Sequence, residues 1–231
     1  IHLSDSHFLI LCIEVANGVT SVAISDNGVC MAEQTIPQAN KAADVLHTQV
    51  HVLLQTAGLR LSDLQAVAVS AGPGSYTGLR IGVAAAKGYC FALSIPLIAV
   101  PSFEAMVEGI QNRYGKTGFD AYMPMIDARR MEVFTGIYSP TAEVRQSFSS
   151  LIVDETFSDW LKQDKILLFG NGAFKASAYM AGSRSDIMQD FQPAAADMCR
   201  LAYNRWKNGQ TEDIAYYEPH YSKAFYTPAN K

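Results

Sequence analysis

The amino-acid sequence predicts an α/β protein with a partly parallel sheet. Two observations support this class: short apolar runs such as Leu64–Ser70 alternate with segments of helical character, and glycine-rich turns separate them. The chain has 231 residues, of which 49% are hydrophobic and 17% are charged. It is therefore long enough to bury a substantial core and too apolar for a disordered segment.

The first half is expected to open with an antiparallel meander. Asn17-Gly18 and Asn27-Gly28 are hairpin turn signals that lie between apolar runs. Three strands are predicted around these turns: Phe8–Val15, Thr20–Ser25 and Val29–Ile36.

Helices and strands are expected to alternate after the meander. A helix over Ala42–Ala57 is predicted to end at Gly58, because glycine readily adopts the left-handed conformation that terminates helices. The other elements of this half are a strand at Leu64–Ser70, a helix at Gly78–Leu93 capped by Thr77, a strand at Ile95–Val100 and a helix at Phe103–Ile110 capped by Ser102.

The polar segment 112–118 carries two glycines, and we place the boundary between an N-terminal lobe, 1–111, and a C-terminal lobe, 112–231, at its start. The second half repeats the pattern of strands followed by strand–helix units, which favours an internal duplication. Its predicted elements are strands at Ala121–Ile126, Glu132–Tyr138, Val144–Val153 and Lys165–Phe169, a short helix from Asp154 to Leu161, a helix at Pro193–Lys207 and an extended tail at Tyr216–Lys231.

Composition narrows the classes of function. The net charge is −4 and no cluster of lysine and arginine stands out, so we do not expect this chain to bind nucleic acid alone. The four cysteines contain no CxxC pair, which is typical of free thiols in a reducing compartment. No apolar stretch is long enough to span a bilayer and no signal peptide is recognised, so a cytoplasmic protein without membrane contact is expected.

The segment SAGPGSYTGLR, residues 70–80, joins a predicted strand to a predicted helix. A nucleophile elbow has the spacing G-x-S-x-G, but Gly74 directly precedes Ser75 here. The segment is therefore interpreted as a tight strand-to-helix connection. Phosphate binding by backbone N–H groups at the start of the helix is left open.

Two helices have unusual faces. The helix at Ala42–Ala57 is apolar over more than one narrow stripe, which indicates a second buried surface. The helix at Gly78–Leu93 has interior glycines, which cost about 1 kcal/mol each relative to alanine. Close packing of another helix, from the same chain or from a partner, would offset this cost. Small residues recur every four positions at Gly78, Gly82, Ala86, Cys90 and Ser94, and a second small row contains Ala84, Gly88 and Ala92.

Long motifs resemble those of the TsaB (YeaZ) family. The run AVSAGPGSYTGLRIGVAAAKG, followed by FALSIPLIAVPSFEAM, closely resembles this family, and ILCIE, MIDARRMEVF and AYYEPHYSKAF are further matches. Together the matches span almost the whole chain.

The resemblance implies a two-lobed fold like that of actin, Hsp70 and sugar kinases. It also implies a non-catalytic subunit of the complex that transfers threonylcarbamoyl to N6 of adenosine 37 in tRNAs reading ANN codons. The implied partners are a TsaD-type catalytic subunit and a TsaE-type ATPase, with tRNA bound through the complex and homodimerisation when the chain is alone. No cofactor is expected on this chain, since the metal and ATP belong to the partner subunits.

The resemblance also implies sites. The first two helices of the N-terminal lobe would contact the TsaD-type subunit, and the expected interface residues are Leu46, Val50, Leu53, Gly78, Arg80, Gly82, Ala86 and Cys90. A loop next to a nucleotide would contain Glu14, Gly72, Gly74 and Ser75.

The chain departs from the family pattern at the first strand, where Glu14-Val15 replaces Asp-Thr, and this departure argues against ATP binding at the loop. The alternative function is a degenerate peptidase or nucleotide-hydrolysing enzyme of the same fold. Whether Arg80, Lys87 or Arg129-Arg130 touch tRNA is left open.

Overall fold

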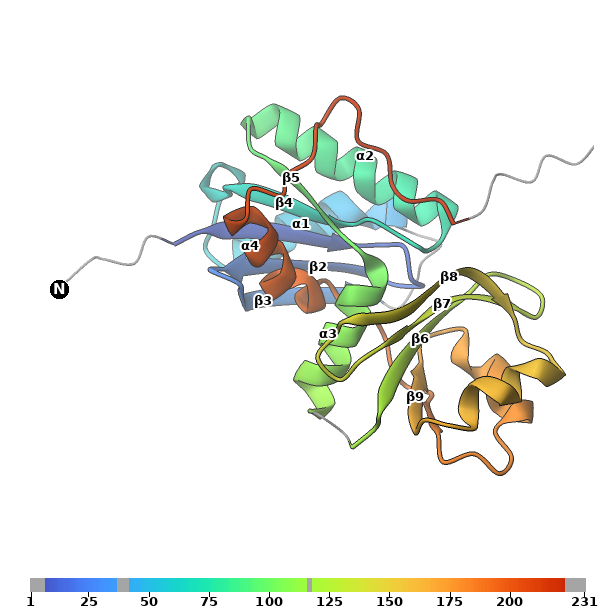
Figure 1. The fold of residues 1–231 in the computed structure, drawn as a ribbon. Coiled ribbons are helices and arrows are strands. Elements are labelled where there is room, and N and C mark those ends of the chain that lie inside the picture. Colours follow the sequence, from blue (N-terminus) through green and yellow to red (C-terminus); the bar gives the residue numbers. More distant parts are fainter. Residues whose placement is uncertain (1–6, 37–41, 116–117, 223–231) are drawn as a thin grey trace, which may run out of the picture.

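A computed structural model describes residues 7–36, 42–115 and 118–222, and it arranges them around two mixed five-stranded sheets (Figure 1). The first sheet has the strand order β3-β2-β1-β4-β5. The first three strands pair antiparallel, whereas β1, β4 and β5 run parallel. The strands are β1 (Leu9–Glu14), β2 (Thr20–Asp26), β3 (Val29–Ile36), β4 (Ala66–Ser70) and β5 (Leu97–Val100).

Helices cover both faces of the first sheet. Alternate residues of a strand point to opposite faces, so Leu11 and Ile13 of β1 pack with the helices α1 (Ala42–Thr56) and α2 (Tyr76–Leu93). Ile10 and Cys12 instead pack with the 3-10 helix η5 (Ala195–Met198) and the helix α4 (Cys199–Lys207). The strand β1 is therefore fully buried on both sides.

The second sheet repeats the topology of the first. Its order, β8-β7-β6-β9-β10, has three antiparallel strands followed by two that run parallel. This repetition supports the internal duplication that the sequence pattern favours. The strands are β6 (Ala121–Asp127), β7 (Glu132–Tyr138), β8 (Val144–Ile152), β9 (Ile166–Phe169) and β10 (Asp186–Met188), and the 3-10 helices η3 (Glu155–Leu161) and η4 (Ala173–Tyr179) cover one face.

The helix α3 (Ser102–Tyr114) joins the two sheets. Its Ala105 belongs to the apolar cluster of the first sheet, whereas Phe103 and Met106 belong to a cluster of the second. The predicted boundary between residues 111 and 112 falls inside this helix. Moreover, η5 and α4 return to the first sheet, a packing that a division into 1–111 and 112–231 does not anticipate.

Some local predictions need correction. The first residue of α2 is Tyr76 and its N-cap is Ser75, so Thr77 is not the cap. Pro101 stands at the N-cap of α3, whose first residue is Ser102. The single helix expected over Pro193–Lys207 is divided into η5 and α4, while η4, β10 and the short η2 (Leu61–Asp63) were not predicted.

The sequence predicts an extended tail at Tyr216–Lys231. Its described part, from Tyr216 to residue 222, contains no regular helix, and the remainder lies outside the described residues. Within the described residues, no helix has the length and apolar character needed to cross a membrane.

Ion pairs fix α4 and η5 to α3. The Glu108 carboxylate is buried and binds the Arg200 guanidinium, whose Nε lies 2.5 Å from Oε1. Arg113 binds Asp197 at 2.6 Å, and Arg205 binds Glu104 at 2.7 Å. These pairs hold the returning C-terminal segment against the helix that connects the sheets.

We expect Arg200→Ala to lower the free energy of unfolding by about 2 kcal/mol, because it leaves the buried Glu108 carboxylate without its charged partner. Urea denaturation would measure the change. The control is Lys162→Ala, which removes an exposed ion pair to Asp159 and should alter stability little. Equal effects of the two substitutions would contradict the prediction.

Candidate functional site

The loop after β1 meets the glycine-rich loop before α2. The Ser75 N–H donates to the Ala16 carbonyl at 2.8 Å, and Gly74 lies so close that an added Cβ would be 2.8 Å from Ala16 Cβ. The structure therefore brings together three of the residues predicted for a nucleotide-adjacent loop, Glu14, Gly74 and Ser75. The fourth, Gly72, packs elsewhere: an added Cβ would lie 2.5 Å from the His220 carbonyl oxygen of the C-terminal segment.

The Glu14 carboxylate is surrounded by groups of the chain itself. Its Oε1 accepts hydrogen bonds from the Ala16 N–H at 2.7 Å and from Asn17 Nδ2 at 3.2 Å, and its Oε2 accepts one from the Ser70 hydroxyl. Glu14 is 1% exposed, and this burial raises its pKa, although the hydrogen bonds act in the opposite direction. The carboxylate therefore supports the loop from inside.

The glycine-rich loop is filled by its own chain. Ser75 Oγ accepts a hydrogen bond from the Gly78 N–H at 3.3 Å, and the Ala71 carbonyl accepts one from the His220 N–H at 2.7 Å. The Gly72 carbonyl in turn accepts from the Ser102 N–H at 2.9 Å. The loop thus connects α2, α3 and the C-terminal segment, which agrees with its interpretation as a tight strand-to-helix connection.

The expected interface residues require a correction. All except Arg80 are buried within the chain and therefore offer little surface to a partner: Leu46, Val50, Leu53, Gly78, Gly82, Ala86 and Cys90. The small row of α2 faces its own sheet. A Cβ at Gly78 would lie 2.2 Å from the Val15 carbonyl oxygen, and one at Gly82 would lie 2.8 Å from Val15 Cγ2. These small residues let α2 approach the sheet.

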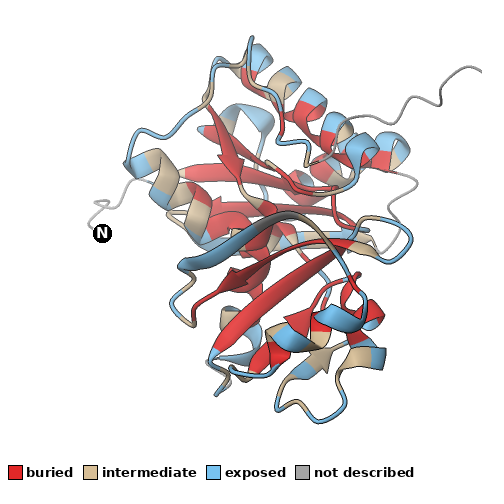
Figure 2. Cartoon of the chain, turned by 45° about the vertical axis from the view of Figure 1, so that its right-hand side comes forward, coloured by how far each residue is buried: buried red, intermediate tan, exposed pale blue. Residues whose placement is uncertain are grey.

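The opposite side of α2 is exposed, as Figure 2 shows by its pale outer turns. Phe91 is 82% exposed, and a Cβ added at Gly88 would have no neighbour within 4 Å in the part of the chain that the structure describes. We call this surface the outer face of α2 and define it by Arg80, Ala84, Gly88, Phe91 and Ala92. Its small residues belong to the second small row in the sequence. Phe91 was missed, although an aromatic residue beside such a row was the available signal.

The neighbouring helix α1 contributes to the same side of the molecule. His47 Nδ1 and the Tyr89 hydroxyl form a hydrogen bond of 2.7 Å, and their rings pack edge to face at 5.5 Å. His47 and His51 are exposed on α1. The two helices therefore present one connected surface.

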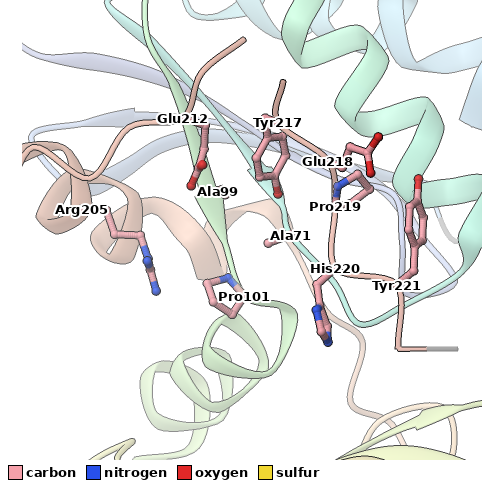
Figure 3. Close-up of a pocket in the computed structure, with 10 residues that line it drawn as sticks. All are labelled: Ala71, Ala99, Pro101, Arg205, Glu212, Tyr217, Glu218, Pro219, His220 and Tyr221. Carbon is pink, nitrogen blue, oxygen red and sulfur yellow. The ribbon is translucent and has the colours of Figure 1, made fainter. Parts of the chain in front are cut away.

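A pocket of about 470 Å³ lies where the C-terminal segment crosses the ends of β4 and β5 (Figure 3). Such carboxyl ends of parallel strands are common ligand sites in α/β proteins. Burial raises the pKa of Tyr217 to about 12, so its hydroxyl stays protonated at neutral pH. The sequence did not indicate this pocket, whose lining combines acidic and basic side chains: Ala71, Ala99, Pro101, Arg205, Glu212, Tyr217, Glu218, Pro219, His220 and Tyr221.

Comparisons with known proteins identify the family. A family model described as TsaD: tRNA N6-adenosine threonylcarbamoyltransferase matches residues 36–221. The tRNA threonylcarbamoyladenosine biosynthesis protein TsaB of Bacillus subtilis is 32% identical over 169 residues, which are 69% of each chain. The chain belongs to the TsaB (YeaZ) family. TsaB of Escherichia coli is 27% identical over 220 residues, covering 92% of this chain and 93% of that one.

Solved structures confirm the fold of this TsaB family member. A Pseudomonas aeruginosa protein described as similar to the peptidase YEAZ superposes with a TM-score of 0.76 at 24% identity, covering 94% of this chain and all of that one. An activator of 2-hydroxyisocaproyl-CoA dehydratase from Clostridium difficile gives a TM-score of 0.50 at 10% identity, covering 89% of this chain and 97% of that one. The predicted two-lobed α/β fold, with mixed sheets and flanking helices, is confirmed.

The two kinds of glycine in α2 should respond oppositely to substitution. Gly78→Ala is expected to destabilise the protein by about 2–3 kcal/mol, because the new methyl group meets the Val15 carbonyl. Gly88→Ala is the matched control, and it should stabilise the helix by about 1 kcal/mol, since no described residue lies within 4 Å of the added Cβ. Urea denaturation of both variants would test this, and a stabilising Gly78→Ala would contradict the packing described.

The buried Glu14 carboxyl should affect how stability depends on pH. Its pKa in the folded protein is raised above the ordinary value of 4.5, so the folded state binds the proton more tightly than the unfolded state. The wild-type protein should therefore lose stability relative to Glu14→Gln as the pH rises above 4.5. Urea denaturation at several pH values would measure the difference, and a difference that does not change with pH would refute the prediction.

Proposed function

We propose that this chain acts in the biosynthesis of threonylcarbamoyladenosine in tRNA, as a non-catalytic subunit that pairs with a TsaD-type catalytic subunit. The observation that carries the pairing is the outer face of α2, where Phe91 is 82% exposed among small residues. Membership of the TsaB family supports a role in this biosynthesis, since the relatives are named tRNA threonylcarbamoyladenosine biosynthesis protein TsaB.

The outer face of α2 has the properties of a helix-packing surface. A large exposed aromatic side chain on a helix is a typical anchor in protein interfaces. No described residue lies within 4 Å of a Cβ added at Gly88, so packing among the described residues does not offset the cost of this glycine in helix stability. An approaching helix would gain from both features, because small residues allow close backbone contact and Phe91 supplies buried area.

The connection between α1 and α2 extends this surface. The hydrogen bond between His47 and Tyr89 fixes the two helices beside each other, and both helices present exposed polar groups around the apolar centre. A polar rim around an apolar anchor is the usual arrangement in an interface. Arg80, the one predicted interface residue that is exposed, stacks on Tyr76 and lies at the N-terminal end of the surface.

The absence of catalysis on this chain is part of the proposal. The Glu14 carboxylate is engaged by backbone, amide and hydroxyl donors, and the glycine-rich loop bonds to its own chain. Both features support a structural use of the loop that would otherwise be the site for nucleotide. We accordingly expect the metal and ATP on the TsaD-type and TsaE-type partners, and we expect the assembled complex to act on adenosine 37 of tRNA.

Phe91→Glu and Ala84→Glu should each weaken association with the TsaD-type subunit at least tenfold, because a buried unpaired carboxylate opposes interface formation. The melting temperature of the isolated chain should not fall. Phe174→Glu is the control, since Phe174 is also exposed but lies on η4 of the other sheet. Co-expression with the partner, followed by mass measurement in solution, would report the result.

If Phe91→Glu bound the TsaD-type subunit as tightly as the wild type does, the outer face of α2 would not be the interface. A wild-type chain that forms only homodimers in the presence of the TsaD-type subunit would argue against the heterodimer. Turnover of ATP or peptides by the purified chain, well above background, would favour the alternative of an enzyme.

A further inference from the structure

The turn between β6 and β7 holds two arginines in an unusual backbone conformation. Arg129 has a φ of 70° and Arg130 a φ of 50°, the left-handed region that favours glycine and asparagine. Among the described residues they are the only consecutive pair of non-glycine residues with positive φ. Both side chains are exposed. Non-glycine residues kept in this region often mark a functional site, so the pair requires an explanation.

These arginines also differ from the others in how their side chains are used. In the described residues, neither Arg129 nor Arg130 has a side-chain hydrogen bond or an ion pair. The guanidinium group of each remaining arginine donates a hydrogen bond within the chain: Arg60, Arg80, Arg113, Arg145, Arg184, Arg200 and Arg205. The turn therefore presents two adjacent positive charges whose donors are not used internally.

The backbone under this turn is firmly held. The Asp127 carboxylate accepts the Arg129 N–H at 2.7 Å and binds the buried Lys175 ammonium at 2.5 Å. Lys175 also donates to the Glu132 carbonyl at 2.8 Å, and Asn171 Oδ1 accepts the Asp127 N–H at 2.8 Å. Both ends of the turn are thus fixed to η4 and its preceding loop, which orients the arginines before any ligand arrives.

We propose that the Arg129-Arg130 turn binds phosphate groups of the tRNA backbone. The inference rests on the proposed function, since it concerns tRNA held by the assembled complex. A guanidinium group binds phosphate through paired hydrogen bonds and keeps its charge at any physiological pH. The chain as a whole carries a charge of −4, so at physiological salt this turn adds a local contact to a complex, and it holds tRNA without the complex only at low salt.

The experiment measures tRNA binding by the complex with the TsaD-type subunit at several salt concentrations. The double variant R129A/R130A should bind a tRNA that reads ANN codons about tenfold more weakly. Its plot of log affinity against log salt should be less steep by one to two, since each lost phosphate contact lowers the slope by about one. R145A/R184A removes the same charge from the same half of the chain, and it should leave both quantities unchanged.

A second variant separates binding from folding. Arg129→Gly suits the left-handed backbone better, so its melting temperature should rise while its affinity for tRNA falls. Unchanged tRNA affinity of R129A/R130A, or equal weakening by R145A/R184A, would overturn the proposal. The proposal would also be overturned if R129A/R130A no longer bound the TsaD-type subunit but still bound tRNA, because the turn would then contact a protein partner.

The same samples separate failure of this inference from failure of the proposed function. Assembly of the wild-type complex is measured first, by mass in solution. If the complex does not form, the pairing is refuted, and the turn is tested on the full chain with tRNA at low salt. There, equal affinities of wild type and R129A/R130A would overturn the inference, and weaker binding by the variant would support it.

Discussion

The close approach of α2 to the end of β1 is the constraint on which the rest of the N-terminal half depends. It exists because Gly78 and Gly82 have no side chain to separate the helix from Val15. Once the helix lies there, the preceding loop must turn against Ala16, where Ser75 forms its backbone hydrogen bond and caps the helix. The outer face of α2 points away from the sheet, and no described residue covers it.

Local signals in the sequence were sufficient for much of the fold. Asn-Gly turns and short apolar runs predicted the meander and the central strands, since these depend on neighbours in the sequence. The orientation of the small row could not be predicted, because small residues suit packing against a sheet as well as against a helix. Thr77 and Ser75 are both good caps, and the choice is made by the contact of Ser75 with Ala16, a residue distant in sequence.

The duplication places a carboxylate at the same position in each half of the chain. Glu14 ends the first strand of one sheet, and Asp127 ends the corresponding strand of the other. Both carboxylates are committed to bonds within the chain, Glu14 to the loop around Ala16 and Asp127 to Lys175 and the following turn. Two loops at equivalent positions therefore use their carboxylates to hold the chain's own backbone and side chains.

The return of α4 to the first sheet has a consequence for how the protein is made. One face of that sheet is built from residues 9–100, but its cover is supplied by residues 195–207. During synthesis the ribosome must add almost the entire second half before this apolar face can be closed. The N-terminal half is therefore not an independent folding unit in the order of translation, and the two lobes become complete together.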